Sequence, residues 1–245
     1  MLDVHPPHQA AHTWKDFLIH IATIVIGLLI AIGLEQTVEA IHHANERRQL
    51  IAELREEAQS NHLTLQKDIN ILLSEAEWDA AAIAVLDHAA AKDGVVQVEL
   101  PAHKGFGHNR APYRSTWTIA TNNGTAALLP KERAQAYELM DRDAALLQTA
   151  TEARNTAAVE MRRLELKLQM RLVSGSRLTI SDREVPALVE SFASRAAALQ
   201  AEAERDAILA GYCESVANDI FDPRRVGDFI AKNANAVVDR TGWGF

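Results

Sequence analysis

The sequence has little of several residue types, and each shortage excludes a class of protein. Cys213 is the one cysteine among 245 residues, so no intrachain disulfide can form. Aromatic residues make up 5% of the chain, glycine and proline are few, and alanine is abundant, a composition that favours helices. The formal net charge of −8 argues against nucleic acid as a partner, because binding to phosphates requires a basic surface.

Residues 17–34 form an apolar run in which His20 is the one side chain that can carry a charge. A helix of this length spans roughly 27 Å, close to the hydrocarbon thickness of a bilayer. A signal peptide usually has a shorter apolar region followed by an A-x-A-like cleavage site, which the following residues, EQTVEAIHH, lack. A buried core helix is the alternative, but such helices are rarely apolar on every face. The run therefore predicts a transmembrane helix in a lipid bilayer, with Trp14 at the interface.

Small residues recur along one face of this helix. Thr23, Gly27 and Ala31 are spaced four apart, a pattern that lets a second helix approach closely. The pattern predicts a helix–helix contact with other membrane protein subunits or with a second copy of the chain. Chance is the alternative, because small residues are common in membrane helices.

Two features of the sequence favour opposite orientations of the predicted transmembrane helix. Lys15 precedes the apolar run, whereas Arg47 and Arg48 follow it at a distance, so a strict charge count favours a cytoplasmic C-terminus. Long domains translocate largely regardless of charge, however, and a short tail before one apolar helix is the usual layout of a signal anchor. We expect the N-terminus inside and the large domain outside.

Apolar residues at steps of three and four predict long helices in the rest of the chain. Each helix has one apolar stripe that must be buried against the others. We therefore predict an all-α fold, in which the N-terminal transmembrane helix continues into an antiparallel helical bundle or coiled coil. The predicted parts are a tail (1–16), the transmembrane helix (17–34), a long helix leaving the membrane (35–93), a loop with short elements (94–129), a helical hairpin (130–221), and a short helix with a tail (222–245).

Several local signals refine this plan. The stripe of the long helix consists of Leu54, Ala58, His62, Leu65, Ile69, Leu72, Ala76, Ala80 and Ile83. The second helix of the hairpin has the stripe Leu188, Phe192, Ala196, Leu199, Ala203, Ala207, Ala210, Ala217 and Ile220. VVQVEL at 95–100 predicts a weak strand, and Ser181 with Glu184 resembles a capping box. Cys213, at the edge of its stripe, is more simply a packing residue than a nucleophile.

Two segments resemble a known group of proteins. The residues VHPPHQAAHTWKDFLIHIATIVIGLLIAIGLEQTVEAIHH (4–43) and, more loosely, STWTIATNNGTAALLPKERAQAYEL (115–139) are similar to a broad group of uncharacterised bacterial membrane proteins. That group has an N-terminal transmembrane helix followed by a helical domain. The resemblance implies a bacterial single-pass membrane protein. Together with the orientation expected above, we predict an anchor in the bacterial inner membrane and a large domain in the periplasm. The resemblance transfers no catalytic residue.

Four histidines near the N-terminus are of a type that can bind a metal or a haem. His5, His8 and His12 have helical ligand spacing, but Pro6 and Pro7 disfavour a regular helix there, so the simpler interpretation is a disordered or interfacial tail. A bis-histidine haem on His20 would require a second chain to supply the other ligand. We therefore expect neither a metal nor a cofactor.

The loop at 101–114 is the best candidate for a ligand or partner contact, because loops often carry function. Its candidate residues are His103, Lys104, His108 and Arg110, and a solvated loop is the alternative. Catalytic signatures such as G-x-S-x-G, H-E-x-x-H and the P-loop do not occur in the sequence. We therefore expect a non-enzymatic structural, assembly or accessory subunit of a membrane protein complex. The alternative is a sensor-like, ligand-binding helical module anchored in the membrane.

Overall fold

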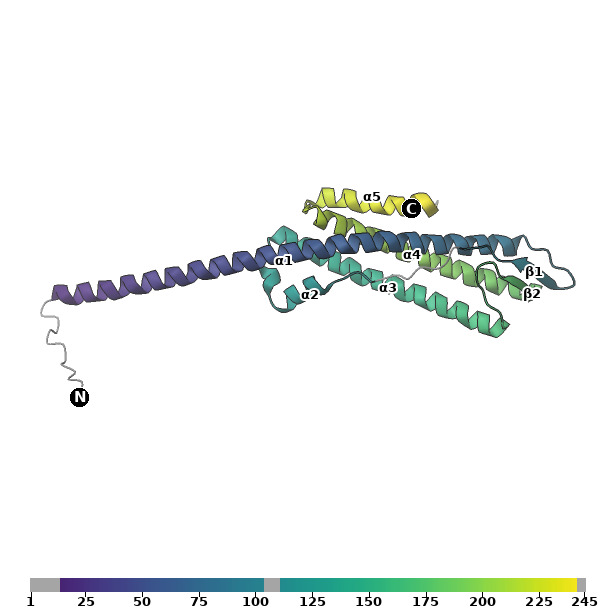
Figure 1. The fold of residues 1–245 in the computed structure, drawn as a ribbon, viewed down its shortest axis with the longest axis horizontal. Helices are drawn as coiled ribbons and strands as arrows, with labels where there is room; N and C mark the ends of the chain where they lie inside the picture. The colour runs from purple at the N-terminus through teal and green to yellow at the C-terminus, as the bar shows by residue number, and fades with distance from the viewer. Residues whose placement is uncertain (1–13, 104–110, 242–245) are drawn as a thin grey trace, which may run out of the picture. The chain divides into compact units, whose positions relative to one another are not determined.

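The computed structural model describes residues 14–103 and 111–241, and these residues are mainly helical, which confirms the all-α class (Figure 1). The elements are α1 (Trp14–Asp87), β1 (Val95–Glu99), α2 (Ser115–Asn122), the 3-10 turn η1 (Thr125–Leu128), α3 (Lys131–Leu168), β2 (Arg177–Ser181), the 3-10 turn η2 (Asp182–Glu184), α4 (Val185–Ala217) and α5 (Pro223–Thr241). The chain divides into two compact units, Met1–Gln49 and Leu50–Phe245, and α1 contributes to both.

In the first unit, the described part of α1 exposes almost all of its side chains. The apolar residues of 17–34 are exposed, and the rings of Trp14 and Phe17 stack with centroids 5.3 Å apart. Among the described residues, α1 is the helix long and apolar enough to cross a membrane, judged by length and composition. An exposed apolar surface of this size is unfavourable in water, and a bilayer would cover it.

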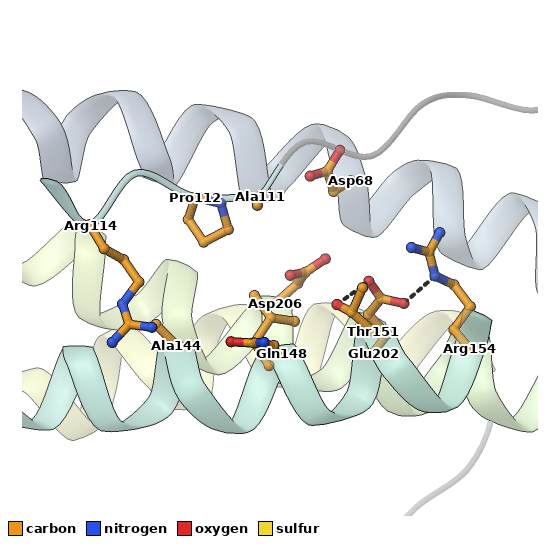
Figure 2. A pocket seen from close by; sticks show the side chains of 11 residues that line it. Asp68, Ala111, Pro112, Arg114, Ala144, Gln148, Thr151, Arg154, Glu202 and Asp206 are labelled. Carbon is orange, nitrogen blue, oxygen red and sulfur yellow. Dashed lines mark hydrogen bonds and ion pairs between the residues drawn. The ribbon is translucent and has the colours of Figure 1, made fainter. Parts of the chain in front are cut away.

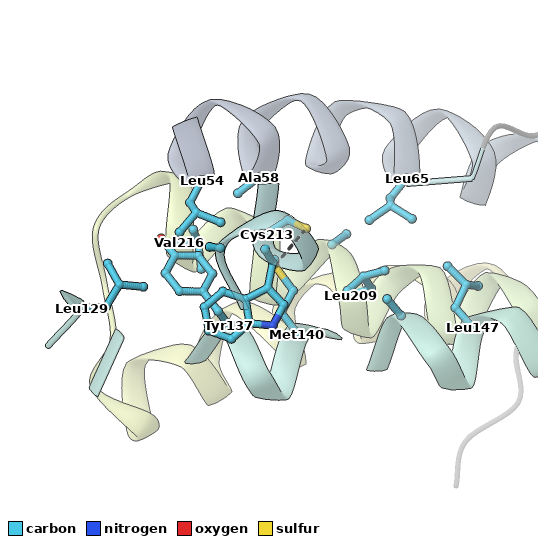
Figure 3. Close-up of a cluster of buried hydrophobic side chains, with 14 of the residues drawn as sticks. Leu54, Ala58, Leu65, Leu129, Tyr137, Met140, Leu147, Leu209, Cys213 and Val216 are labelled. Atoms are coloured by element: carbon cyan, nitrogen blue, oxygen red, sulfur yellow. Dashed lines mark hydrogen bonds between the residues drawn. The ribbon is translucent and has the colours of Figure 1, made fainter. Parts of the chain in front are cut away.

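The second unit is a bundle of α3, α4, α5 and the last part of α1. One buried cluster joins Leu54 of α1 to Tyr137 near the start of α3 and Val216 near the end of α4 (Figure 3). Another joins Trp78 of α1 to Met161, late in α3, and to Phe192, early in α4. These pairings mean that α4 runs antiparallel to both α1 and α3. The antiparallel packing predicted for the bundle is therefore present between α4 and these two helices.

α5 returns along α4. Its residue Val237 is buried against Ala203 in a third cluster, whereas Ile230 lies against Gly211. Since position 211 follows 203 and position 230 precedes 237, α5 is antiparallel to α4.

The strand β2 was missed from the sequence. It pairs antiparallel with β1, with Val96 opposite Ile180 and Val98 opposite Leu178. Leu178 and Ile180 are buried while their neighbours Arg177 and Thr179 are exposed, which is the two-residue period of a strand. Five residues are too few for that alternation to stand out beside the SGS break. The strand predicted at 95–100 is confirmed as β1, and the capping box of Ser181 and Glu184 is present.

Two further details differ from expectation. α1 ends at Asp87, a few residues early, and the turn into β1 uses Asp93 and Gly94 with φ of 55° and 74°. The predicted stripe also loses register after Ala76, since Ala80 is exposed. Buried positions continue instead at Asp79, Ala82 and Leu86, because a period of 3.6 residues requires steps of three as well as four.

Candidate functional site

A cavity of about 330 Å³ lies inside the second unit, a size at the lower end of small-molecule sites (Figure 2). It is bounded by α1, α3, α4 and the segment 111–114. The lining residues are Asp68 from α1, Ala111, Pro112 and Arg114 from that segment, Ala144, Leu147, Gln148, Thr151 and Arg154 from α3, and Glu202 and Asp206 from α4.

Glu202 is held in place from α3. It is 3% exposed, and its Oε1 accepts a hydrogen bond of 2.9 Å from the hydroxyl of Thr151. Arg154 Nε lies 2.6 Å from its Oε2, in an ion pair that lacks the alignment of a hydrogen bond. A buried carboxylate requires such compensation, so Thr151 and Arg154 fix Glu202 on one wall of the cavity (Figure 2).

Asp206 lies one helical turn after Glu202 and is held differently. Its side chain points into the cavity, it is 3% exposed, and in the part of the chain that the structure describes its carboxyl has no hydrogen-bond partner (Figure 2). Burial raises the pKa of Asp206 to about 8, with further increases from Glu202 and Asp68 and an opposing effect of Arg154. Asp206 is therefore a mostly protonated acid at neutral pH.

Arg114 lines the cavity close to solvent, where its guanidinium pairs with Asp141 of α3. Both side chains are about one third exposed. This pair attaches the segment 111–114 to α3. It also engages the charge of Arg114, which leaves the acidic character of the interior in place.

Of the four loop residues predicted to contact a partner, the structure describes one. His103 lies outside the cavity lining, where its Nε2 is 3.2 Å from the hydroxyl of Ser74 and its ring meets Trp78 edge to face. Its backbone N–H also donates to Ser174. These contacts give His103 a structural role at the β1 end of the bundle. Lys104, His108 and Arg110 lie outside the described residues, so the loop contact stays a prediction.

The predicted helix–helix face is open in the first unit. Thr23, Gly27 and Ala31 are exposed, and a Cβ added at Gly27 would meet nothing within 4 Å. The hydroxyl of Thr23 donates to the carbonyl of Ile19, 2.9 Å away, which satisfies its polar group within the helix. The face can accept another helix, and its role as a contact stays a prediction.

The remaining candidates are placed simply. His5, His8 and His12 lie outside the described residues, and within 14–103 and 111–241 no three His, Cys, Asp or Glu side chains gather to hold a metal ion. Cys213 is fully buried with its thiol 3.8 Å from the sulfur of Met140 (Figure 3). Burial raises the pKa of Cys213 to about 12, as befits a packing residue.

The acids of the cavity lie beside the apolar stripes in the sequence, a position that does not by itself distinguish them from surface acids. Glu202 and Asp206 stand four apart, each one residue before an alanine of the predicted stripe, and Asp68 directly precedes Ile69 in the other stripe. Acids beside an apolar stripe usually reach solvent. Here the three acids line a cavity between α1, α3 and α4, which no single stripe predicts.

Together these observations define a class of protein. It is a helical bundle that has a cavity lined by acidic residues, and the same chain has an exposed apolar helix near its N-terminus. Comparison of the chain with protein-family models, with curated protein sequences and with solved structures finds no match.

Proposed function

We propose that the second unit is a non-enzymatic ligand-binding module and that residues 17–34 anchor it in a membrane. One observation supports binding above all: Asp206, a residue 3% exposed, lines the cavity of about 330 Å³, and no described residue donates a hydrogen bond to its carboxyl group. Folded proteins rarely leave a buried polar group unsatisfied unless a ligand or water completes it. This favours the sensor-like interpretation over the assembly role, which the sequence alone placed first.

We further propose that the anchor lies in a bacterial inner membrane with the module in the periplasm. The exposed apolar surface of residues 17–34 supports a membrane anchor, and long domains translocate largely regardless of their charge. A reporter fused after Phe245 tests this orientation. An alkaline phosphatase fusion should be active, and an active cytoplasmic reporter at the same position would contradict it.

A thermal-shift screen of the full chain in mild detergent tests the binding function. A ligand at 100 times its Kd stabilises by about 2.7 kcal/mol, which raises Tm by several degrees. Ala144→Leu fills the cavity, because Ala144 is buried in its lining, whereas Ala145→Leu on the exposed face of α3 is the matched control.

Compounds that bind in the cavity should raise Tm in the native chain and in Ala145→Leu but not in Ala144→Leu, each relative to its own unliganded Tm. The proposal fails if a broad library shifts none of the three proteins. It also fails if Ala144→Leu responds like the native chain.

A second candidate function is that of a structural, assembly or accessory subunit of a membrane complex. The open face of Thr23, Gly27 and Ala31 favours it, since nothing approaches a Cβ built at Gly27. Gly27→Leu should then abolish association in pull-downs from native membranes. Gly33→Leu, at an equally open glycine off that face, should not. Unchanged partners and stoichiometry in Gly27→Leu would exclude this face as the contact.

A further inference from the structure

Among the described residues that line the cavity, three are acids and two are arginines. Arg154 is paired with Glu202, and Arg114 is paired with Asp141 at the edge. Asp68 of α1 and Asp206 of α4, 5% and 3% exposed, line the same space from opposite walls (Figure 2). Both arginine charges are thus engaged by carboxylates other than that of Asp206.

Asp206 is an acid of the cavity lining to which no described residue donates a hydrogen bond. Its carboxyl points into the space, is almost completely buried, and has no hydrogen-bond partner in the described residues (Figure 2). A ligand that satisfies it must donate hydrogen bonds, and a positively charged donor forms the strongest of these. Apolar groups of Pro112, Ala144 and Leu147 provide contacts for a carbon skeleton.

We infer that the cavity binds a small organic cation whose ammonium group donates to the carboxylate of Asp206, an inference that rests on the binding function proposed above. The cavity volume of about 330 Å³ limits the ligand to a small molecule. An anion is disfavoured, because it would lie beside Asp68, Glu202 and Asp206 while both arginines are already engaged.

Binding exchanges one charge for another. With the cavity empty, Asp206 has a proton at neutral pH, because burial together with Glu202 on α4 and Asp68 on α1 raises its pKa to about 8 against the effect of Arg154 on α3. A bound ammonium ion favours the ionised carboxylate. One cation therefore enters as one proton leaves to solvent, and the net charge of the cavity is unchanged.

This exchange gives the binding a distinctive pH dependence. The affinity for an amine should rise by about tenfold per pH unit up to about pH 8, because the ionised form of Asp206 becomes more abundant. A neutral ligand that accepts a hydrogen bond from the protonated acid would show the opposite trend above pH 8. The sign of the pH dependence separates the two kinds of ligand.

Titration calorimetry of the full chain in detergent provides the test. The probes are butylamine, 1,4-diaminobutane and phenethylamine, each beside the alcohol and the carboxylate of the same skeleton, at pH 6, 7, 8 and 9. Amines should bind at least tenfold more tightly than their alcohols at pH 8. Buffers with different ionisation enthalpies should report release of close to one proton per amine bound at pH 6 to 7.

The variant Asp206→Asn keeps the shape of the protonated acid, and Asp228→Asn, at an exposed aspartate of α5, is its matched control. Asp206→Asn should bind amines at least tenfold more weakly at pH 8 and without pH dependence, while Asp228→Asn should match the native chain. Proton release in the native chain gives a measure that does not depend on how any variant folds.

The outcomes separate this inference from the proposed function. Binding of the alcohols or carboxylates without the amines overturns the cation but leaves a ligand-binding module. Amine binding without proton release, or binding undiminished in folded Asp206→Asn, also overturns it. If neither these probes nor the thermal-shift library binds, both proposals fail.

Discussion

Gly211 of α4 and Ile230 of α5 pack backbone against backbone. A Cβ added at Gly211 would lie 2.5 Å from the Cα of Ile230 and 2.8 Å from its amide nitrogen, closer than real atoms come. Nearby, the side-chain amide of Asn233 donates to Glu214 Oε2 at 2.9 Å. The position of α5 on α4 therefore depends on the absence of a side chain at residue 211.

Gly211→Ala should lower the free energy of unfolding by about 1–3 kcal/mol, because the added methyl group forces α5 away from α4. Urea unfolding of the full chain measures this, and faster amide exchange confined to α5 would locate it. Gly227→Ala is the control, since a Cβ there meets nothing within 4 Å. Alanine is the better helix former, so this variant should gain up to about 1 kcal/mol. Equal stability of the two variants would contradict the close contact.

Glu57 of α1 caps α2 from outside that helix. Its Oε2 accepts hydrogen bonds from the backbone N–H of Thr116, from the Thr116 hydroxyl and from the Ser115 hydroxyl, at 3.0, 2.8 and 3.1 Å. Glu57→Ala should destabilise the chain by about 1–2 kcal/mol, the usual loss for an N-terminal cap. Glu56→Ala, at the exposed neighbour, should change little. Chemical denaturation measures the free energy of unfolding of both variants. Equal values for Glu57→Ala and Glu56→Ala would contradict a stabilising cap.

Arg195 neutralises a fully buried acid. Its Nε and a terminal nitrogen donate to the two oxygens of Asp79 at 2.8 and 2.5 Å, and its guanidinium lies 5.4 Å from the Trp78 ring. Arg195→Leu should cost about 3–5 kcal/mol at pH 7, because it leaves the charge of Asp79 buried without its arginine.

The pH dependence of that loss has a definite sign. Burial already raises the pKa of Asp79 despite Arg195, and removing the arginine raises it further above the unfolded value. The loss in Arg195→Leu should therefore be larger at pH 8 than at pH 5, where protonation relieves the buried charge. Exposed Arg205→Leu is the control, and Asp79→Asn with Arg195→Leu should recover part of the stability. A loss independent of pH would show that packing, not charge, dominates.

The helices of the fold could be read from the sequence because each has a long stripe of apolar residues. Leu54, Ala58 and Leu65 on α1 are buried as expected, and the break at 174–176 lies between α3 and α4. β2 could not be predicted in this way, because it has only two buried residues, Leu178 and Ile180. Their strand conformation is evident only from the pairing of β2 with β1.

The cavity depended on tertiary geometry to a greater degree. Asp68, Arg154 and Asp206 come from three helices, and their convergence follows from the spacing of those helices rather than from a motif. The sequence instead emphasised the loop near His103, because glycines, histidines and cations are visible within one segment. Buried charge that is assembled from separate helices gives no local signature.

Asp206 should make the stability of the chain fall as pH rises. Its pKa is about 8 in the folded state and about 4 when unfolded, so the folded chain holds one more proton between these values. The stabilisation from this extra proton is fully present below about pH 4 and is lost as pH rises to about 8, at about 1.4 kcal/mol per pH unit.

Asp206→Asn remains neutral throughout, so its stability relative to the native chain should increase steadily from pH 5 to pH 8. Urea unfolding at four pH values measures the difference, with Asp228→Asn expected to follow the native chain, and a constant difference would mean that Asp206 is ionised in the fold.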